Sequence, residues 1–356
     1  MERKGRVAII SRESDSRTLD VGLLEAELLR RGLEVKVLSR LLTKDLSAGM
    51  LGYGAEVLKQ EAAILASDVV VLDTYCIPVS MLPHLRRTKV VQMWHALSAV
   101  KKFGWQTVGL RDGSSARTAS LMRMHKGYDY VACASDVTAG HFCEAFRTDR
   151  SRIAKYGLPR IDYIKSVSNG ERKDELRAKI HRRYPQLGSA GKKTVLYVPT
   201  FRRNTDLDLT ELIESIDKEK FDLVIKLHPL YRHVRNEAED RGGVIFDEEF
   251  SSFDWLSAAD IIISDYSSLV VESTLADKPL YLYVYDMDEY AESTGLNVDF
   301  ENEPIADYVF RDAASLAKAL SEPYNMEKLR AFRDRYIDID TENCTSDLAD
   351  FIESLI

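Results

Sequence analysis

Short apolar runs alternate with helical patterns along almost the whole chain. The runs that have the length of a buried strand lie at 6–10, 35–38, 68–72, 89–93, 129–132, 194–198, 223–227, 261–263 and 280–285, with a weaker one near 244. The helical patterns lie at 20–31, 56–66, 171–184, 209–216, 252–258, 269–276, 312–319, 325–336 and 346–354. Alternation of this kind is typical of a parallel sheet covered by helices. The chain is therefore predicted to be an α/β protein.

The alternation is interrupted near the middle of the chain. The segment 156–162, YGLPRID, contains Gly and Pro, and 188–193 reads as a loop. The run at 129–132 is therefore expected to be the last strand of a first half. A length of 356 residues suits two domains of about 150 residues each. We predict two Rossmann-like domains, 1–170 and 171–356, with a ligand cleft between them and with the last helix packing back on the first domain.

Composition argues against several classes of protein. The formal net charge of −8 argues against general nucleic-acid binding. The cysteines form no CxxC pair, which predicts reduced thiols and no zinc site. No apolar run approaches the ~20 residues that a membrane-spanning helix needs, and no long apolar segment precedes a cleavage site at the N-terminus. A cytoplasmic protein without a nucleic-acid partner is therefore expected.

The polar turn after the run at 261–263 is the first candidate for a binding site. Ligands of open parallel sheets bind beyond the carboxyl ends of the strands. The turn contains Asp265, Ser267 and Ser268, and the helix expected at 269–276 begins there. Backbone N–H groups and the helix dipole at such a place favour phosphate. The simpler interpretation is that these side chains only cap the helix.

Two further strand ends carry a histidine. His95 stands in the tripeptide WHA and is a candidate general base. His228 is followed by Pro229, which fixes the loop and keeps the imidazole at the edge of the sheet. The alternatives are that His95 is a structural residue packed beside Trp94 and that His228 is incidental to a proline that ends the strand.

The remaining candidates suit a nucleotide. Thr200 and Arg202 follow the run at 194–198, and a hydroxyl with a guanidinium suits a phosphate group, although a solvated basic turn is the alternative. Helical spacing places Ser268 and Glu272 on one face, where the carboxylate is suited to the two hydroxyls of a ribose. A surface glutamate is the alternative for Glu272. Together, the polar strand ends favour a shared site for a nucleoside diphosphate.

Several short motifs also occur in a characteristic order. They are WHA (94–96), KKFG (101–104), YGLPRID (156–162), YVPTFR (197–202), KLHP (226–229) and the long stretch 259–290. In this order they resemble the CDP-glycerol glycerophosphotransferases of teichoic-acid synthesis. The resemblance implies the GT-B fold, with a first domain for the acceptor and a second for a CDP-alcohol around a cleft.

The resemblance further implies a reaction. A polyol phosphate is transferred from CDP-glycerol or CDP-ribitol, CMP is released, and neither a cofactor nor a metal is expected. The implied acceptor is a lipid-linked saccharide or a polyol-phosphate polymer of the cell wall or capsule.

Roles for single residues follow from the same resemblance. His95 corresponds to the family's proposed general base for the acceptor hydroxyl, and His228 corresponds to a histidine that contacts the diphosphate. Ser267 and Ser268 fall on the hydroxyls of the family's DYSS motif, also at the diphosphate. Glu272 stands where the family usually has Asp.

The chain departs from the family pattern at two places. Ala96 replaces the usual Gly after His95, and the segment 303–306 lacks the usual Gly-Pro pair. Both departures bear on the acceptor or on the alcohol that the donor carries. Glycerol is the family default for this alcohol.

A basic stretch interrupts the acidic chain. Between 86 and 126 there are nine Lys or Arg residues and one acidic residue, Asp112, with aromatic and other apolar side chains interleaved. The candidates for a membrane or acceptor patch are Lys101, Lys102, Arg111, Arg117, Arg123 and Lys126. Such a patch suits anionic lipid headgroups at the inner face of the cell membrane, or a polyanionic acceptor. A solvated loop is the remaining interpretation.

Two other functions fit the same strand ends. A GT-B glycosyltransferase or epimerase that uses a nucleotide sugar needs the same phosphate site and the same ribose carboxylate. A non-catalytic nucleotide-binding protein retains the fold, although the presence of both histidines with the serines argues against it. Release of CMP or UDP from a panel of donors separates these functions.

Overall fold

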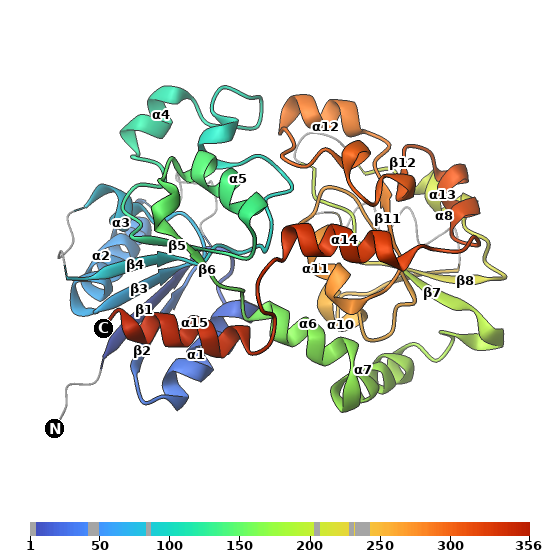
Figure 1. Ribbon diagram of the computed structural model, residues 1–356, viewed down its shortest axis with the longest axis horizontal. Helices are drawn as coiled ribbons and strands as arrows, with labels where there is room; N and C mark the ends of the chain where they lie inside the picture. The colour runs from blue at the N-terminus through green and yellow to red at the C-terminus, as the bar shows by residue number, and fades with distance from the viewer. Residues whose placement is uncertain (1–4, 42–49, 83–86, 203–206, 228–230, 232–242) are drawn as a thin grey trace. The chain divides into compact units, whose positions relative to one another are not determined.

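The chain forms two compact units, each built on a six-stranded parallel sheet (Figure 1). The computed structural model describes residues 5–41, 50–82, 87–202, 207–227, 231 and 243–356. Unit 1 comprises Met1–Asp162 and Tyr336–Ile356, and unit 2 comprises Tyr163–Arg335. The predicted α/β class with two Rossmann-like halves is confirmed, whereas the domain limits at 170 and 171 stay a prediction.

The sheet of unit 1 has the strand order β2-β1-β3-β4-β5-β6. Its strands are β1 (Arg6–Ser11), β2 (Glu34–Ser39), β3 (Val69–Leu72), β4 (Lys89–Gln92), β5 (Tyr130–Cys133) and β6 (Ile153–Lys155). Ile9 in β1 pairs with Val37 in β2 and with Val71 in β3. This order places the carboxyl ends of β1, β3 and β4 next to one another.

The central strands of this sheet are buried on both faces because they are apolar on both sides. Ala8 and Val70 belong to a cluster with side chains of α2, α3 and α5, and the alternate residues Ile9 and Val71 are buried as well. The helices of unit 1 are α1 (Leu19–Arg30), α2 (Met50–Ala66), α3 (Ile77–Met81), α4 (Ala116–Leu121), α5 (Asp136–Phe146) and α15 (Cys344–Ser354).

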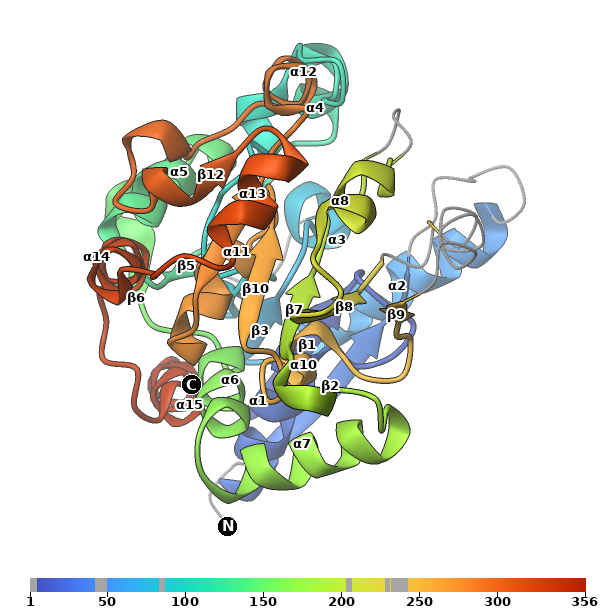
Figure 2. The same ribbon diagram turned by 90° about the vertical axis from the view of Figure 1, so that its right-hand side faces the viewer.

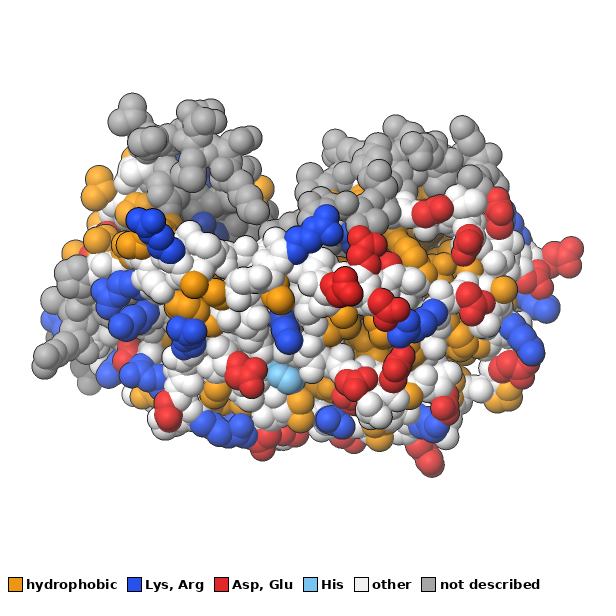
Figure 3. All heavy atoms as spheres, turned by 90° about the horizontal axis from the view of Figure 1, so that it is seen from above, with side chains coloured by type: hydrophobic (Ala, Val, Ile, Leu, Met, Phe, Trp, Pro, Cys, Tyr) orange, Lys and Arg blue, Asp and Glu red, His pale blue; other side chains and the backbone are white. Residues whose placement is uncertain are grey.

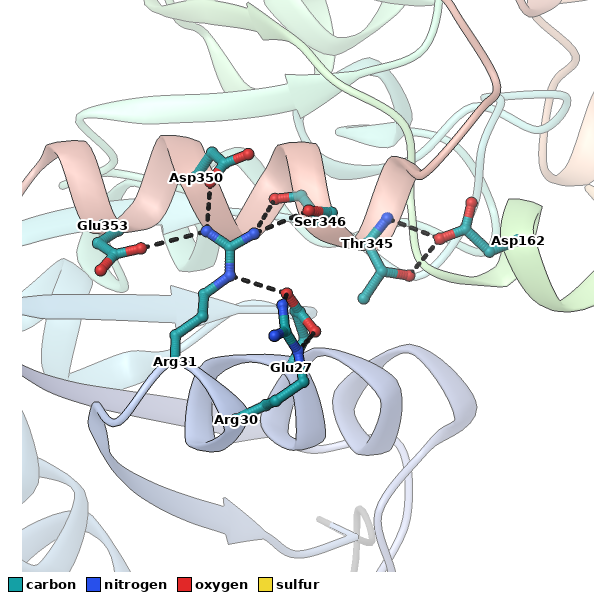
Figure 4. A network of polar contacts seen from close by, with 8 residues as sticks. All are labelled: Glu27, Arg30, Arg31, Asp162, Thr345, Ser346, Asp350 and Glu353. Atoms are coloured by element: carbon teal, nitrogen blue, oxygen red, sulfur yellow. Dashed lines mark hydrogen bonds and ion pairs between the residues drawn. The ribbon is translucent and has the colours of Figure 1, made fainter.

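The last helix of the chain, α15, lies against α1 and is joined to it by Arg31 (Figure 4). The guanidinium of Arg31 donates to Glu27 Oε1 (2.8 Å) in α1 and to Ser346 Oγ (2.8 Å) in α15. It also pairs with Asp350 and Glu353 on the next turns of α15. One half-buried cation therefore connects the beginning of unit 1 to its end.

The YGLPRID motif has a structural role within unit 1. Asp162 accepts hydrogen bonds from the first two amides of α15, at 2.9 and 2.8 Å, and Figure 4 shows the second of these bonds, from Thr345. Arg160 Nε donates to Asp20 of α1 (2.8 Å), and both side chains are buried. A Cβ at Gly157 would lie 2.7 Å from Cys344 Sγ, so only glycine fits this close approach.

The sheet of unit 2 has the strand order β12-β11-β10-β7-β8-β9. Its strands are β7 (Lys193–Tyr197), β8 (Phe221–Ile225), β9 (Val244–Phe246), β10 (Ile261–Ser264), β11 (Leu280–Tyr283) and β12 (Val309–Phe310). Figure 2 shows β10, β7 and β8 side by side. The carboxyl ends of β7, β10 and β11 are therefore neighbours.

Helices α8 and α13 cover one face of this second sheet. Val195 and Ile263 from the strands pack in one cluster with Leu212 of α8 and Leu316 of α13. The helices of unit 2 include α7 (Gly170–Arg183), α8 (Thr210–Ser215), α10 (Ser252–Trp255), α11 (Leu269–Glu272), α12 (Met287–Ser293), α13 (Ala313–Ala319) and α14 (Met326–Tyr336), and α6 (Arg160–Ser168) begins at the end of unit 1. Val195 pairs in register with Ile261 and Leu223, and Ile263 pairs with Tyr197. The same residues therefore belong to the sheet and to the core.

Several expectations about elements are wrong. The run at 129–132 corresponds to β5 and is not the last strand of its half, because β6 pairs with it. The sequence of β6 is only IAK, which is too short and too polar to be recognised by pattern. The segment 286–304, expected to be irregular, contains α12, whose first turn carries Asp288 and Glu289 at the favourable end of the helix dipole. The short strand β12 was also missed.

Candidate functional site

His95 lies just beyond the carboxyl end of β4. Its Nδ1 is 2.9 Å from the main-chain oxygen of Asp73, which follows β3. Because a carbonyl oxygen only accepts hydrogen bonds, Nδ1 carries the proton of the neutral ring and Nε2 keeps the free electron pair. The side chain is 36% exposed. The main chain of unit 1 therefore selects the tautomer that a general base at Nε2 requires.

The turn that presents His95 is strained and is held from inside the sheet. Trp94 has a φ of 64°, which is rare for a bulky residue. Its amide donates to Gln92 Oε1 (2.9 Å), and Gln92 Nε2 donates to the main-chain oxygen of Thr74 (3.0 Å). Gln92 is completely buried. Backbone strain that is fixed by buried contacts is typical of functional sites.

An aromatic cluster supports Trp94 and explains the KKFG motif. The Trp94 ring stacks on Phe103 with 4.6 Å between the ring centroids. Gly104 has a φ of 56°, and a side chain there would overlap the main-chain oxygen of Ala145. Burial lowers the pKa of His125, which packs edge-on to Trp94, to about 3. His125 is therefore neutral near pH 7 and serves as an aromatic side chain of this cluster.

Two carboxylates that sequence reasoning missed lie near His95. Glu13 Oε1 is 3.8 Å from His95 Nδ1. Asp73 is 1% exposed, and its carboxylate lies close to the hydroxyls of Ser11 and Thr74. Burial raises the pKa of Asp73 to about 6, and the hydrogen bond with Ser11 and the interaction with His95 offset part of this effect. Both residues follow strand ends, so the rule that selected His95 could have found them.

In unit 2, Asp265 joins the ends of two neighbouring strands. Its carboxylate is completely buried and accepts hydrogen bonds from the amide of Thr200 (2.9 and 3.0 Å) and from the amide of Tyr266 (2.7 Å). Thr200 is 6% exposed, and its hydroxyl has no hydrogen-bond partner in the part of the chain that the structure describes. Asp265 therefore fixes the loop after β7 and leaves the Thr200 hydroxyl unused.

Arg202 connects the ends of three strands. Its guanidinium lies 3.0 Å from Asp265 Oδ2, donates to Asp286 after β11 (3.0 Å between Nη2 and Oδ1), and donates to the main-chain oxygen of Thr200 (2.9 Å). The side chain is 3% exposed. Burial disfavours its charge, but the bonds to Asp286 and the charge of Asp265 outweigh burial and raise the pKa of Arg202. Arg202 is thus enclosed by protein partners.

The two serines of the DYSS motif are more accessible than Arg202 and Asp265. Ser267 and Ser268 are both half-buried. Ser267 Oγ accepts from the amide of Leu269 (3.3 Å), and Ser268 Oγ donates to Glu272 Oε2 (3.4 Å). Glu272 is 2% exposed, so it is not the surface glutamate of the alternative interpretation.

The helix that follows these serines is shorter than expected. The pattern at 269–276 predicted one helix, but α11 ends at Glu272 and continues as the 3₁₀ turn Ser273–Ala276. A single α-helical turn has few aligned peptide dipoles. The serine hydroxyls, more than a helix dipole, are therefore the groups that this turn offers to a phosphate.

His228 lies outside the described residues, but the end of β8 before it is firmly anchored. Lys226 Nζ is 3.0 Å from Asp247 Oδ2, and Asp247 also accepts from the Tyr184 hydroxyl (2.7 Å) and from Trp255 Nε1 (2.9 Å). Burial raises the pKa of Asp247, but these hydrogen bonds outweigh burial and lower it. No motif in the sequence indicated this network.

The basic stretch surrounds α4 in unit 1 and exposes four of its six candidate residues. Arg111, Arg117, Arg123 and Lys126 are exposed, whereas Lys101 and Lys102 are half-buried. Leu121 at the end of α4 is 64% exposed. Figure 3 shows a face of unit 1 on which Lys and Arg side chains lie among hydrophobic ones. In the described part of the chain, no helix combines the length and apolarity needed to cross a bilayer.

Comparison with known families decides the class of the protein. A family model described as CDP-glycerol:poly(glycerophosphate) glycerophosphotransferase matches residues 30–354. The chain belongs to this family. The glycerophosphotransferase match spans nearly all of both units and includes every motif quoted above. The protein is therefore a transferase, as its motifs predicted, and a non-catalytic nucleotide-binding protein is not supported.

Individual relatives of this glycerophosphotransferase are enzymes of teichoic-acid synthesis. The teichoic acid ribitol-phosphate primase of Bacillus spizizenii is 29% identical over 332 residues, which cover 89% of this chain and 83% of the primase. The teichoic acid glycerol-phosphate primase of Bacillus subtilis is 31% identical over 299 residues, which cover 82% and 74%.

Solved structures confirm the fold. The wall teichoic acid polymerase TagF superposes with a TM-score of 0.71 at 18% identity, over 98% of this chain and 88% of that chain. The UDP-GlcNAc 2-epimerase of Neisseria meningitidis superposes with a TM-score of 0.62 at 13% identity, over 98% and 100%. The predicted GT-B fold of the glycerophosphotransferase is therefore confirmed.

Proposed function

We propose that this enzyme transfers a polyol phosphate from a CDP-alcohol to a hydroxyl group of a teichoic-acid precursor or polymer and releases CMP. The observation that carries the proposal is His95, whose Nε2 is left basic by the bond from Nδ1 to Asp73. Membership of the glycerophosphotransferase family supports the class of donor. The relatives are named for ribitol phosphate and glycerol phosphate, which supports CDP-glycerol or CDP-ribitol as that donor.

The proposed reaction forms one P–O bond and breaks another. The acceptor hydroxyl gives its proton to Nε2 of His95, and its oxygen attacks the phosphorus that carries the polyol. The bond from this phosphorus to the bridging oxygen breaks, and CMP leaves with the electron pair. Phosphoryl transfer relies mainly on positioning and charge stabilisation, so the protein needs to supply a base and hydrogen-bond donors.

The donors of these hydrogen bonds are proposed to lie in unit 2. Ser267, Ser268 and the unused hydroxyl of Thr200 bind the diphosphate, together with His228. Glu272 binds the ribose hydroxyls. The half-buried position of both serines and the unpaired hydroxyl of Thr200 support these assignments.

Arg202 and Asp265 are proposed to act on the donor indirectly. They are bound to each other inside the protein, and their remaining bonds go to Thr200 and Asp286. Because both side chains are buried and bonded to described residues of the neighbouring loops, their contribution is to hold the loop that carries Thr200. Direct binding of the donor by Arg202 and Asp265 stays a prediction from the sequence, and the contacts above favour the positioning role.

A panel of donors tests the reaction. The purified protein is incubated with CDP-glycerol, CDP-ribitol or UDP-GlcNAc, with and without a lipid-linked disaccharide, and release of CMP or UDP is measured. We expect CMP from one CDP-alcohol, and only with the acceptor. The mass of the product shows whether one unit or many are added. Release of UDP, or no release from either CDP-alcohol, would contradict the proposal.

We also propose that the basic surface around α4 binds the inner face of the cell membrane. The exposed Arg117 and Arg123 with the exposed Leu121 form a surface suited to anionic headgroups, where each basic side chain contributes about 1 kcal/mol. Co-sedimentation with phosphatidylglycerol vesicles should fall about 10-fold or more in an Arg117→Glu, Arg123→Glu variant. Arg330→Glu in unit 2 is the control.

Two outcomes would contradict membrane binding by this surface. One is co-sedimentation that does not depend on the anionic lipid. The other is unchanged vesicle binding combined with a raised KM for the acceptor, which would assign the basic surface to a polyanionic acceptor.

A further inference from the structure

Two acidic residues from neighbouring strand ends meet the imidazole of His95. Glu13 follows β1, Asp73 follows β3 and His95 follows β4, and these three strands are consecutive in the sheet. Glu13 Oε1 lies 3.8 Å from Nδ1, the same nitrogen that donates to the main-chain oxygen of Asp73. The position of Glu13 is itself tied to the sheet, because its amide donates to Ser11 Oγ (3.4 Å) at the end of β1.

The two partners of Nδ1 divide the tasks that one aspartate performs in many catalytic triads. In a triad, the carboxylate both orients the ring and balances its charge. Here the main-chain oxygen of Asp73 orients the ring, but a carbonyl carries no net charge. The positive charge that forms when Nε2 takes a proton therefore needs a separate counter-charge, and Glu13 is placed to provide it.

We propose that Glu13 is a positioning residue for catalysis, whose carboxylate stabilises the imidazolium of His95 while the main chain of Asp73 fixes the tautomer. This inference rests on the proposed role of His95 as the base. Glu13 is 42% exposed, so its effect is moderated by water and weakened by salt.

Other titratable groups face the ring from the elements packed around it. The buried carboxylate of Asp73 adds negative charge from the end of β3, and burial keeps part of it protonated near pH 6 by raising its pKa. His125 faces Trp94 and His95 from the segment before β5 and contributes no charge, because burial lowers its pKa to about 3. Glu13 thus differs from both in being an accessible carboxylate.

The test compares Glu13→Gln with Glu13→Asp in the full chain. For Glu13→Gln we expect kcat to fall about 5- to 10-fold and the acidic limb of the kcat pH profile to move to lower pH by about half a unit to one unit, with KM for the donor unchanged. Glu13→Asp should restore most of the activity. The loss should shrink in high salt. Glu34→Gln, at the opposite end of the neighbouring strand β2, is the matched control.

An NMR measurement separates orientation from charge. Long-range ¹⁵N–¹H spectra of the histidine rings should show the Nδ1–H tautomer of His95 in both the wild type and Glu13→Gln, because the main chain of Asp73 sets it. Wild-type kcat and an unmoved acidic limb in Glu13→Gln would overturn the inference. Lost activity with an unmoved limb and no rescue by Glu13→Asp would also overturn it, since that pattern indicates a purely structural role.

The proposed base can fail separately from this inference. Near-wild-type turnover in His95→Ala would overturn both the base and the role of Glu13. An inactive His95→Ala together with an unaffected Glu13→Gln would leave the proposed function in place and reject only the counter-charge.

Discussion

The strand ends of the two units use their polar residues in opposite ways. In unit 1, His95 has an available Nε2, Glu13 is partly exposed, and the buried Asp73 has no cation bonded to its carboxylate within the described chain. In unit 2, Arg202 and Asp265 are saturated by one another and by neighbouring loops. The residues of unit 1 remain able to react, whereas Arg202 and Asp265 of unit 2 bind and position neighbouring loops.

The difference shows that a conspicuous charge is a poor guide to a reactive group. Arg202 and Asp265 stand in the most recognisable motifs of unit 2, yet their atoms face protein. Among the described candidate residues of unit 2, the hydroxyls of Thr200 and the two serines are more available than these charged groups. Substitutions at these residues of unit 1 are therefore expected to lower turnover. Substitutions at these residues of unit 2 are expected to lower stability or the affinity for the donor.

The largest effect is expected at His95. His95→Ala removes the proposed base, and turnover should fall about 10²- to 10⁴-fold while circular dichroism and thermal unfolding stay unchanged. The assay is CMP release with the donor and acceptor found in the panel above. His181→Ala on α7 is the control. Turnover within a few-fold of wild type in His95→Ala would place the reactive group elsewhere.

The next effect is expected in the stability of unit 2. Arg202→Met leaves the buried Asp265 and the half-buried Asp286 without their cation, which should cost about 3 to 5 kcal/mol of unfolding free energy. Hydrogen exchange followed by mass spectrometry should show the loss in peptides of unit 2 and not in those of unit 1. Arg330→Met is the matched control, because the exposed Arg330–Asp277 pair should be worth less than about 1 kcal/mol. Equal protection in both variants would refute the structural role of Arg202.

A gain in stability is expected from Asp73→Asn in unit 1. The pKa of Asp73 is raised to about 6 in the folded protein. The folded state therefore binds more protons than the unfolded state between about pH 4 and 6, so the wild type loses stability as the pH rises through this range. The variant lacks this loss and should be more stable above pH 6 by up to about 3 kcal/mol, but not near pH 4.

Thermal unfolding at several pH values measures this difference. Asp129→Asn is an unsuitable control, because its carboxylate accepts from the amide of Val90 (2.9 Å). The exposed Asp15 is also bonded, to the amide of Leu41. Glu34→Gln is used instead. A variant that is less stable than wild type at every pH would show that the Asp73 carboxylate has a partner that stabilises it.

The smallest effect is expected at Thr200. Thr200→Val removes a buried hydroxyl without a partner in the described chain, so stability should change by less than about 0.5 kcal/mol, whereas KM for the donor should rise about 5- to 10-fold. Thr194→Val, at the other end of β7, is the control. An unchanged KM would remove Thr200 from the donor site and leave the serines as the available groups of unit 2.

The sequence was sufficient for the fold because strand and helix periods are local signals. The apolar runs that became β1, β3, β7 and β10 fall within a residue or two of their predicted bounds. Strand β6 was not predicted because IAK is short and ends in a polar residue. Its pairing with β5 also depends on a contact between segments, which a local sequence pattern does not show. Similarly, the helical run at 269–276 could not show that its second half is a 3₁₀ turn.

The site was only partly predictable for a related reason. The rule that polar residues follow strand ends located His95, Thr200 and the serines. It does not show whether a side chain is already bonded to other side chains of the protein. The partners of Arg202, for example, come from loops that follow other strands. The role of Asp73 was invisible because its useful atom is a main-chain oxygen, which every residue has.

The return of the chain to unit 1 at Tyr336 makes unit 2 an insertion within another folding unit. During synthesis, the whole of unit 2 leaves the ribosome before α15 is available to dock on α1 and engage Arg31. Folding of unit 1 is therefore complete only after α15 has been made. A truncation that removes only α15 should consequently destabilise unit 1, which carries His95. It should spare unit 2, although unit 2 precedes α15 in the chain.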